Sequence, residues 1–145
     1  MDVKGAYLNG ILQEKVYMRQ PDGYTDGTDR VCSLHKTLYG LNQSGHEWNK
    51  ELDRRLKELG FTNLWSDPCA YIRRDGDDIQ IITVWVDDLL LFTTNEQLMR
   101  YLKDKLNKMF DLTDLGEPSR IIGIEIIRHD DSLSISQPLY IESIL

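Results

Sequence analysis

Adjacent carboxylates in apolar surroundings are the feature of this sequence most able to do chemistry. Asp87 and Asp88 follow Trp85-Val86 and precede the apolar run from Leu89 to Phe92. Two like charges between apolar strands repel each other unless a positive group compensates them. A divalent cation is a natural compensator, because hard cations bind carboxylate oxygens. The pair therefore predicts a metal site suited to phosphoryl transfer, with a solvated hairpin turn as the alternative.

Phosphoryl transfer of this kind needs a further carboxylate, and Asp2, in the segment 2–10, is the candidate. It lies 85 residues before Asp87 (87 − 2), which allows the two segments to form neighbouring strands. A second acidic pair, Asp77 and Asp78, has a polar flank and reads as an ordinary exposed turn. A calcium-binding domain is a weak alternative, because the aspartates lack the alternating ligand spacing of a calcium loop.

Two amphipathic helices are predicted from apolar residues that recur at spacings of four, four and three. The two series are Trp48, Leu52, Leu56, Leu59 and Leu98, Leu102, Leu106, Met109. Ser44, with Glu47 three residues later, is expected to cap the first helix, and Gly60 to end it. Thr94 and Gln97 are expected to form the corresponding capping box of the second helix, over about Asn95 to Met109.

Short apolar runs bounded by turn residues predict strands. A three-stranded antiparallel meander is expected over Cys69–Arg73, Ile79–Val86 and Leu89–Thr93, and a later hairpin over Arg120–Arg128 and Leu133–Ser136. Val31–Leu34 is a further strand candidate, Asn9-Gly10 marks a turn, and Pro138 is expected to open a third helix. The predicted fold class is α+β, an antiparallel sheet with two helices on one face in a split β-α-β, ferredoxin-like arrangement.

Composition limits the partners and the compartment. The chain has 145 residues, enough for one domain, is 41% hydrophobic, and carries a formal net charge of −7. Non-specific nucleic-acid binding depends on Lys and Arg, so such a role here needs a local basic groove, a metal or further protein segments. No membrane-spanning run or targeting signal is evident, and Cys32 and Cys69 are expected to be reduced. These features favour a cytoplasmic or nuclear protein.

Several ordered segments resemble the reverse transcriptases of copia-type retrotransposons, and together they cover essentially the whole chain. The segments are Asp2-Val3-Lys4-Gly5-Ala6-Tyr7-Leu8-Asn9-Gly10, 16–24, Leu38-Tyr39-Gly40-Leu41-Asn42-Gln43 with Trp48, Trp85-Val86-Asp87-Asp88, 110–117, Ile122-Gly123-Ile124-Glu125-Ile126 and 136–145. The resemblance implies the palm domain of an RNA-directed DNA polymerase over residues 1–145, truncated at both ends and without fingers, thumb or RNase H. It also implies Mg²⁺ as cofactor, with Mn²⁺ able to substitute.

The resemblance assigns roles to individual residues. Asp2, Asp87 and Asp88 would be the catalytic, metal-binding carboxylates, with a backbone carbonyl offered by Val3. The residues that would contact nucleotide, template or primer are Tyr7, Tyr39, Gly40, Gln43 and Trp85, followed by the primer grip Ile122, Gly123 and Ile124. Tyr7 would exclude a 2′-hydroxyl, with a core tyrosine at a strand end as the alternative. The alternative for the primer grip is a buried strand.

The partners implied are an RNA or DNA template with its primer, deoxynucleotides and the other domains of a polyprotein, in a cytoplasmic virus-like particle or the nucleus. The chain departs from the family pattern where Ser44-Gly45-His46 replaces Ala-Pro-Arg, Thr113 replaces a lysine, and Trp85 replaces a tyrosine. The first two changes remove cations, the third places a bulkier ring next to the primer end, and we expect the isolated chain to be inactive. A catalytically dead or co-opted fragment, acting as an acidic binding module, is the alternative function.

Overall fold

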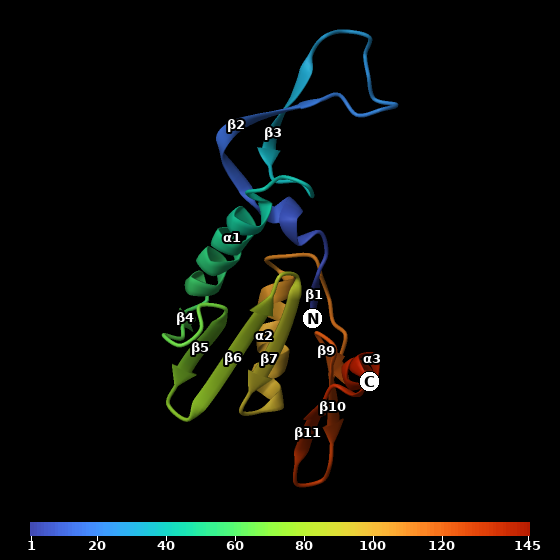
Figure 1. Ribbon diagram of the computed structural model, residues 1–145. Helices are drawn as coiled ribbons and strands as arrows, with labels where there is room; N and C mark the ends of the chain where they lie inside the picture. The colour runs from blue at the N-terminus through green and yellow to red at the C-terminus, as the bar shows by residue number, and fades with distance from the viewer. The chain divides into compact units, whose positions relative to one another are not determined.

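Antiparallel sheets and α-helices build a mixed α+β chain, and residues 1–145 are all described by this computed structural model (Figure 1). The chain divides into two units, Met1–Thr113 and Asp114–Leu145. The first unit contains a six-stranded sheet in the order β4-β5-β6-β7-β1-β8 and a separate β2-β3 hairpin. The second unit contains a three-stranded sheet in the order β11-β10-β9 and a short C-terminal helix.

The elements of the first unit are, in chain order, β1 (Asp2–Val3), the 3-10 helix η1 (Ala6–Asn9), β2 (Ile11–Arg19), β3 (Val31–Lys36), α1 (Ser44–Glu58), β4 (Thr62–Asn63), β5 (Ala70–Asp75), β6 (Asp78–Trp85), β7 (Asp88–Thr93), α2 (Glu96–Asn107) and β8 (Leu112–Thr113). The predicted meander is confirmed, because β5, β6 and β7 are consecutive antiparallel neighbours. Two-residue turns join them, since Asp75 pairs with Asp78, and Trp85 pairs with Asp88.

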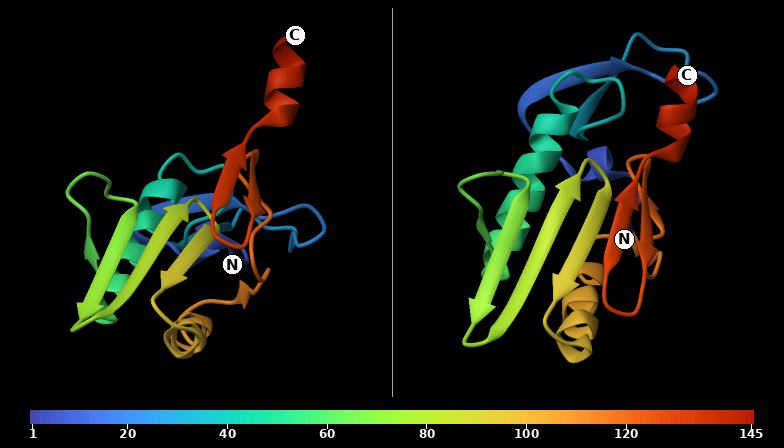
Figure 2. Two further views of the ribbon diagram at one scale, coloured as in Figure 1. Left: turned by 90° about the horizontal axis from the view of Figure 1, so that it is seen from below. Right: turned by 60° about the horizontal axis from the view of Figure 1, so that its bottom comes forward.

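Both long helices pack on the same face of the six-stranded sheet. Their predicted apolar stripes are confirmed, because the stripe residues Trp48, Leu52, Leu56, Leu102 and Leu106 are buried in one core cluster with Tyr71, Ile82 and Leu89 of the strands. Figures 1 and 2 show α1 and α2 on one side of the β5-β6-β7 sheet. The other side of these strands carries exposed residues such as Phe92 and Trp85, so α1 and α2 leave this face of the sheet uncovered.

The helix ends differ in part from the prediction. Asn95, and not Thr94, caps α2, because its side-chain oxygen accepts a hydrogen bond from the Leu98 amide at 2.9 Å. Ser44 is the first residue of α1 rather than its cap, and its hydroxyl donates to the Leu38 carbonyl instead. The end of α1 is as expected, since Gly60 follows it with a φ of 86° that favours glycine.

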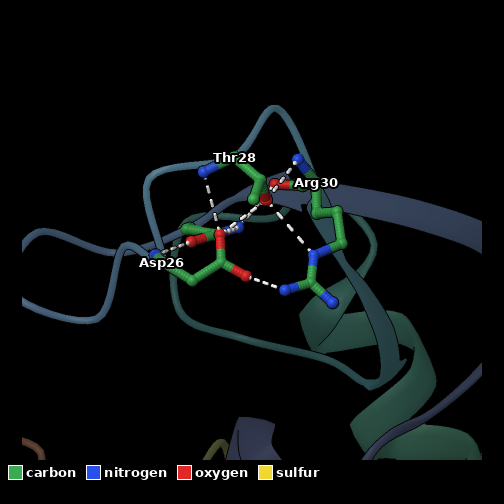
Figure 3. A network of polar contacts seen from close by, with 4 residues as sticks. Asp26, Thr28 and Arg30 are labelled. Atoms are coloured by element: carbon green, nitrogen blue, oxygen red, sulfur yellow. Dashed lines mark hydrogen bonds and ion pairs between the residues drawn. The ribbon is translucent and has the colours of Figure 1, made fainter.

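The loop between β2 and β3 is held by its own polar side chains (Figure 3). Asp26 accepts hydrogen bonds from the hydroxyl and amide of Thr28 and from Gln20, and it pairs with Arg30. The Thr28 hydroxyl, with Gln20, the Thr28 amide and Arg30, lowers the pKa of the Asp26 carboxyl to about 2. These contacts close the loop on itself.

The second unit consists of β9 (Arg120–Ile121), β10 (Ile124–Arg128), β11 (Leu133–Ser136) and α3 (Pro138–Ile144). The hairpin predicted over Arg120–Arg128 and Leu133–Ser136 is confirmed in part, because β10 pairs with β11 but a turn divides the first predicted strand into β9 and β10. The helix opened by Pro138 is confirmed. Ile122 and Gly123 form a two-residue turn between β9 and β10, with φ angles of 50° and 76°. Ile122 is 50% exposed, so the alternative of a buried strand at this position is wrong.

Asparagine at position 122 is expected to stabilise the second unit. A turn with two positive φ angles prefers Asn-Gly, whereas a β-branched residue there is strained by up to about 1–2 kcal/mol. Ile122→Asn should therefore slow hydrogen exchange of the β9-β10 amides. Ile127→Asn is the matched control, since Ile127 is 48% exposed on β10 and its backbone is extended. Equal effects of the two variants would show that turn strain is not the cause.

Candidate active site

The three predicted carboxylates come from neighbouring pieces of the main sheet. Asp2 of β1 lies directly opposite Asp88 of β7 in the antiparallel register, as their separation in sequence allowed. Asp87 is in the turn that precedes β7, and its carbonyl accepts a hydrogen bond from the Val3 amide at 2.9 Å. The backbone therefore brings Asp2, Asp87 and Asp88 to one end of β1 and β7.

The register also fixes the face on which these side chains lie. Successive residues of a strand point to opposite faces, and Val3 and Leu89 are both 1% exposed in the core under the helices. Asp2 and Asp88, their chain neighbours, therefore lie on the face opposite α1 and α2. Cross-strand pairing continues the row on both sides, so that it reads Trp85, Asp88, Asp2 and Thr113 across β6, β7, β1 and β8.

Electrostatics at this row disfavour ionisation of one carboxyl. Partial burial, followed by the charges of Asp87 and Asp2, raises the pKa of the Asp88 carboxyl above its ordinary value. The α-ammonium of Met1 partly offsets this shift, and the neighbouring Lys4 pairs with Asp111 at 3.0 Å. The site thus concentrates negative charge, which is the electrostatic condition under which a cation binds.

The donor set suits a hard divalent cation, because all three side chains are carboxylates. The side chains are nevertheless not gathered into one ligand group: no cluster of three or more His, Cys, Asp or Glu side chains is placed to hold a metal ion. The chemistry of the donors and the placement of their backbones fit a metal site, and closure of the side chains around an ion would have to accompany binding.

Val86 gives the turn before Asp87 an unusual backbone. Its φ is 56°, in the left-handed region that β-branched residues avoid. The Val86 carbonyl accepts a hydrogen bond from the indole nitrogen of Trp48 at 2.7 Å. A cavity lies beside this contact and is lined in part by Tyr7, Gly45 and Cys69.

The residues predicted to contact nucleotide form a second group near η1 and the start of α1. Tyr7 belongs to η1 rather than to a strand end, and it is half-buried. Its ring centroid is 5.0 Å from that of Tyr39, with an interplanar angle of 45°. The hydroxyl of Thr37 donates to the Tyr7 carbonyl, which ties η1 to the segment after β3.

Gly40 and Gln43 follow Tyr39 in the chain. Gly40 has a φ of 96°, and nothing lies within 4 Å of where a Cβ would be, so its surroundings are open. The Gln43 side-chain amide donates to the Glu14 carboxylate of β2 at 2.9 Å. The predicted primer grip, Ile122 to Ile124, belongs to the second unit, where it forms the β9-β10 turn described above.

Two contacts of the site are not predicted by the sequence. The helical spacing of Trp48 predicts a core position, and the only sequence signal for a polar role is that a buried indole N–H needs an acceptor. Thr113 stands where the family pattern has a lysine, but its pairing with Asp2 is not predictable, because β1 and β8 have two residues each.

No helix of the chain is long and apolar enough to cross a membrane.

Comparison with known proteins identifies the family of this chain. Residues 1–145 match the family described as reverse transcriptase (RNA-dependent DNA polymerase). The chain is 39% identical over its whole length to the retrovirus-related Pol polyprotein from transposon TNT 1-94 of Nicotiana tabacum, and 38% identical to that from transposon RE1 of Arabidopsis thaliana. It is 31% identical, over 87% of its length, to the transposon Ty1-MR1 Gag-Pol polyprotein of Saccharomyces cerevisiae.

The chain covers only a small part of these relatives, namely 11%, 10% and 7% of their respective lengths. No solved structure matches the chain. The match of a family over the full chain, together with the identity to these polyproteins, establishes the resemblance seen in the motifs. The chain belongs to the reverse transcriptase family, in the group carried by the Pol polyproteins of copia- and Ty1-type retrotransposons.

Proposed function

We propose that residues 1–145 are the palm of an RNA-directed DNA polymerase and carry its nucleotidyl-transfer site. The observation that carries the proposal is the cross-strand pairing of Asp2 with Asp88, with Asp87 in the adjoining turn. Asp2 and Asp88 come from distant positions of the first unit's sequence, and their backbones meet on the sheet face opposite α1 and α2. A structural role does not account for this arrangement, because the like charges destabilise the pairing of β1 with β7.

Asp2, Asp87 and Asp88 would hold Mg²⁺, to which Val3 would add its carbonyl. When bound at such carboxylates, divalent ions supply activation of the attacking 3′-hydroxyl and charge stabilisation of the leaving pyrophosphate. The chain's own residues position the substrates around that point. Trp85, 58% exposed and next to Asp88 in the row, offers an aromatic surface to the primer end.

Tyr7, on η1, would contact the sugar of the incoming nucleotide. Its contact with Tyr39 limits the movement of its ring, so the ring can act as a wall against a 2′-hydroxyl. The open surroundings of Gly40 leave space for a base or a template backbone to approach the chain closely. Ile122, Gly123 and Ile124 would contact the primer through the exposed β9-β10 turn. The template with its primer, the deoxynucleotides and the other polyprotein domains would be the partners of the chain.

Titration with Mn²⁺ tests the metal-binding part of the proposal. The wild-type chain should show saturable binding by calorimetry and by paramagnetic broadening of signals near the Trp85–Asp88 turn, and Asp87→Asn/Asp88→Asn should abolish both. The control is Asp130→Asn/Asp131→Asn, which changes the charge equally at an adjacent pair in the β10-β11 loop. Loss of binding in the control as well would show a diffuse charge effect and contradict the assigned site.

A catalytically inactive fragment is the second candidate, and two observations favour it. The three carboxylates are not gathered into a metal-binding group, and the chain carries seven more negative than positive side chains. A wild-type chain that binds no Mn²⁺ would support this candidate. A complete reverse transcriptase containing this segment that still synthesised DNA with Asp87→Asn would refute the assigned role of the pair.

A further inference from the structure

The turn that carries Asp87 has a strained residue, although its length of two residues between the paired Trp85 and Asp88 favours a positive φ. Val86 is β-branched, is 44% exposed, and has a φ of 56°. Such a residue in the left-handed region is strained and persists where surrounding contacts fix it. With Ile122, it is one of two non-glycine residues of the chain with a positive φ. The contacts of Val86 must therefore explain why the turn keeps this shape.

Two hydrogen bonds from distant elements fix the peptides on either side of Asp87. The indole N–H of Trp48, on α1, donates to the Val86 carbonyl at 2.7 Å. The amide of Val3, on β1, donates to the Asp87 carbonyl at 2.9 Å. The first bond orients the peptide between Val86 and Asp87, and the second orients the peptide between Asp87 and Asp88. Together they determine the backbone from which both carboxylates project.

Trp48 is itself rigidly placed. It is 2% exposed, and its ring meets the edge of Phe110 with centroids 5.2 Å apart and an interplanar angle of 76°. The space beside the contact is less well filled, since a cavity is lined by Val84, Val86 and the Trp48 ring among others. Because packing around Val86 is incomplete on this side, the shape of the core does not by itself fix the Val86 carbonyl. The hydrogen bond does so.

We propose that Trp48 is a positioning residue, whose indole N–H holds the strained Val86 turn and thereby presents Asp87 and Asp88. The proposal rests on the function proposed above, because it assigns a purpose to the position of these carboxylates. The two roles depend on different parts of the Trp48 side chain. A core role depends on the volume of the indole ring, whereas a positioning role depends on its N–H group.

Replacing Trp48 by 3-benzothienylalanine separates the two roles, because a sulfur takes the place of the N–H and the ring keeps its shape. The matched control is the same replacement of Trp65, which is fully exposed at 104%. The first readout is the backbone conformation of Val86, from its amide–Hα coupling and its carbon chemical shifts. The second is Mn²⁺ affinity. A Phe110→Leu chain, which loosens the packing of Trp48 but keeps its N–H, serves as the stability control.

The expected result is that Val86 leaves the left-handed region in the Trp48 variant alone, and that Mn²⁺ affinity falls about threefold to tenfold, the effect of one hydrogen bond. Val86→Gly, which adopts a positive φ without strain, should reduce this loss when combined with the Trp48 replacement. A Val86 that stays left-handed without the N–H overturns the proposal. So does unchanged Mn²⁺ affinity after the turn has moved.

Failure of the proposed function gives a different pattern. A wild-type chain that binds no Mn²⁺ at Asp87 and Asp88 contradicts the metal site. The Val86 readout still decides whether Trp48 holds the turn, because it requires no metal.

Discussion

Asp88→Asn is expected to make the chain more stable and to abolish nucleotide transfer by a complete reverse transcriptase that contains it. Asp88 lies opposite Asp2 in the register of β1 and β7, and like charges at directly opposed positions destabilise a sheet. Asparagine keeps the shape of the side chain and removes the repulsion. The expected gain in the free energy of unfolding at neutral pH is roughly 0.2–1 kcal/mol, the size of one cross-strand charge pair.

The same substitution removes a carboxylate from the proposed metal site. Loss of one electrostatic contact to the transition state lowers a catalytic rate by roughly a hundredfold to a thousandfold. Primer extension should therefore fall by more than about a hundredfold while the protein melts at a higher temperature. A substitution that raises stability and lowers activity identifies a residue retained for function despite its charge repulsion. Substitution of a structural residue would instead lower both stability and activity.

The stability difference between wild type and Asp88→Asn should depend on pH in a defined direction. Burial, Asp87 and Asp2 raise the folded-state pKa of Asp88, so the folded chain holds the Asp88 proton more tightly than the unfolded chain. Wild-type stability from this group is then highest below the unfolded pKa and falls as pH rises through the folded pKa. Urea unfolding of both chains across acidic and neutral pH should show a gap that closes in acid. A gap that widened in acid would contradict the raised pKa.

Local and short-range signals explain why much of the fold was predictable. The β5-β6-β7 meander depends on apolar runs separated by short turns, and the three strands form in the predicted order. The second turn is Val86-Asp87, so Val86 lies outside the strand predicted over Ile79–Val86, and Asp88 lies inside β7. The stripes of α1 and α2 follow from helical spacing alone. The cap of α2 was misplaced by one residue, because Thr94 and Asn95 are both good caps and only the structure shows which side chain reaches the Leu98 amide.

The candidate site was predictable in composition and not in geometry. Asp87 and Asp88 stand out because charge between apolar runs is unusual, and Asp2 is a candidate because it lies in the family-like segment 2–10. β1 has two residues, however, and exists only because it pairs with β7 and β8, whose residues lie far away in the sequence. Such pairing is a tertiary effect without a local pattern. The hydrogen bond from Trp48 to Val86 is of the same kind, since it joins residues 38 positions apart.

Gly10→Ala is expected to destabilise the chain and to displace the proposed nucleotide side of the site. The Asn9-Gly10 pair predicts a turn, but Gly10 has an ordinary extended backbone, with φ −63° and ψ 138°. Close approach explains the glycine instead. A Cβ there would lie 2.5 Å from the Thr37 hydroxyl oxygen and 3.0 Å from the backbone nitrogen of Trp48.

Relief of that contact must move backbone, because a helix cannot shift one amide alone. The segment η1-β2 would separate from α1, and the bond from the Thr37 amide to the Gly10 carbonyl, 3.0 Å long, would lengthen. Overpacking of this kind costs about 1–3 kcal/mol. Because Thr37 also holds the Tyr7 carbonyl, the ring of Tyr7 should lose its fixed place beside Tyr39.

Gly45→Ala is the matched control, since Gly45 is in α1 and the nearest atom to its added Cβ is the Tyr7 hydroxyl oxygen at an ordinary 3.8 Å. Alanine in place of a helical glycine should stabilise the chain by up to about 1 kcal/mol. Urea unfolding should thus give opposite signs for the two variants, and the Tyr7 ring signals should shift in Gly10→Ala. Equal and small effects would mean that α1 and η1 are less tightly apposed than the distances require. The contact at Gly10 links the two halves of the site, because α1 carries both Trp48, which holds the Asp87 turn, and the amide against which Gly10 packs.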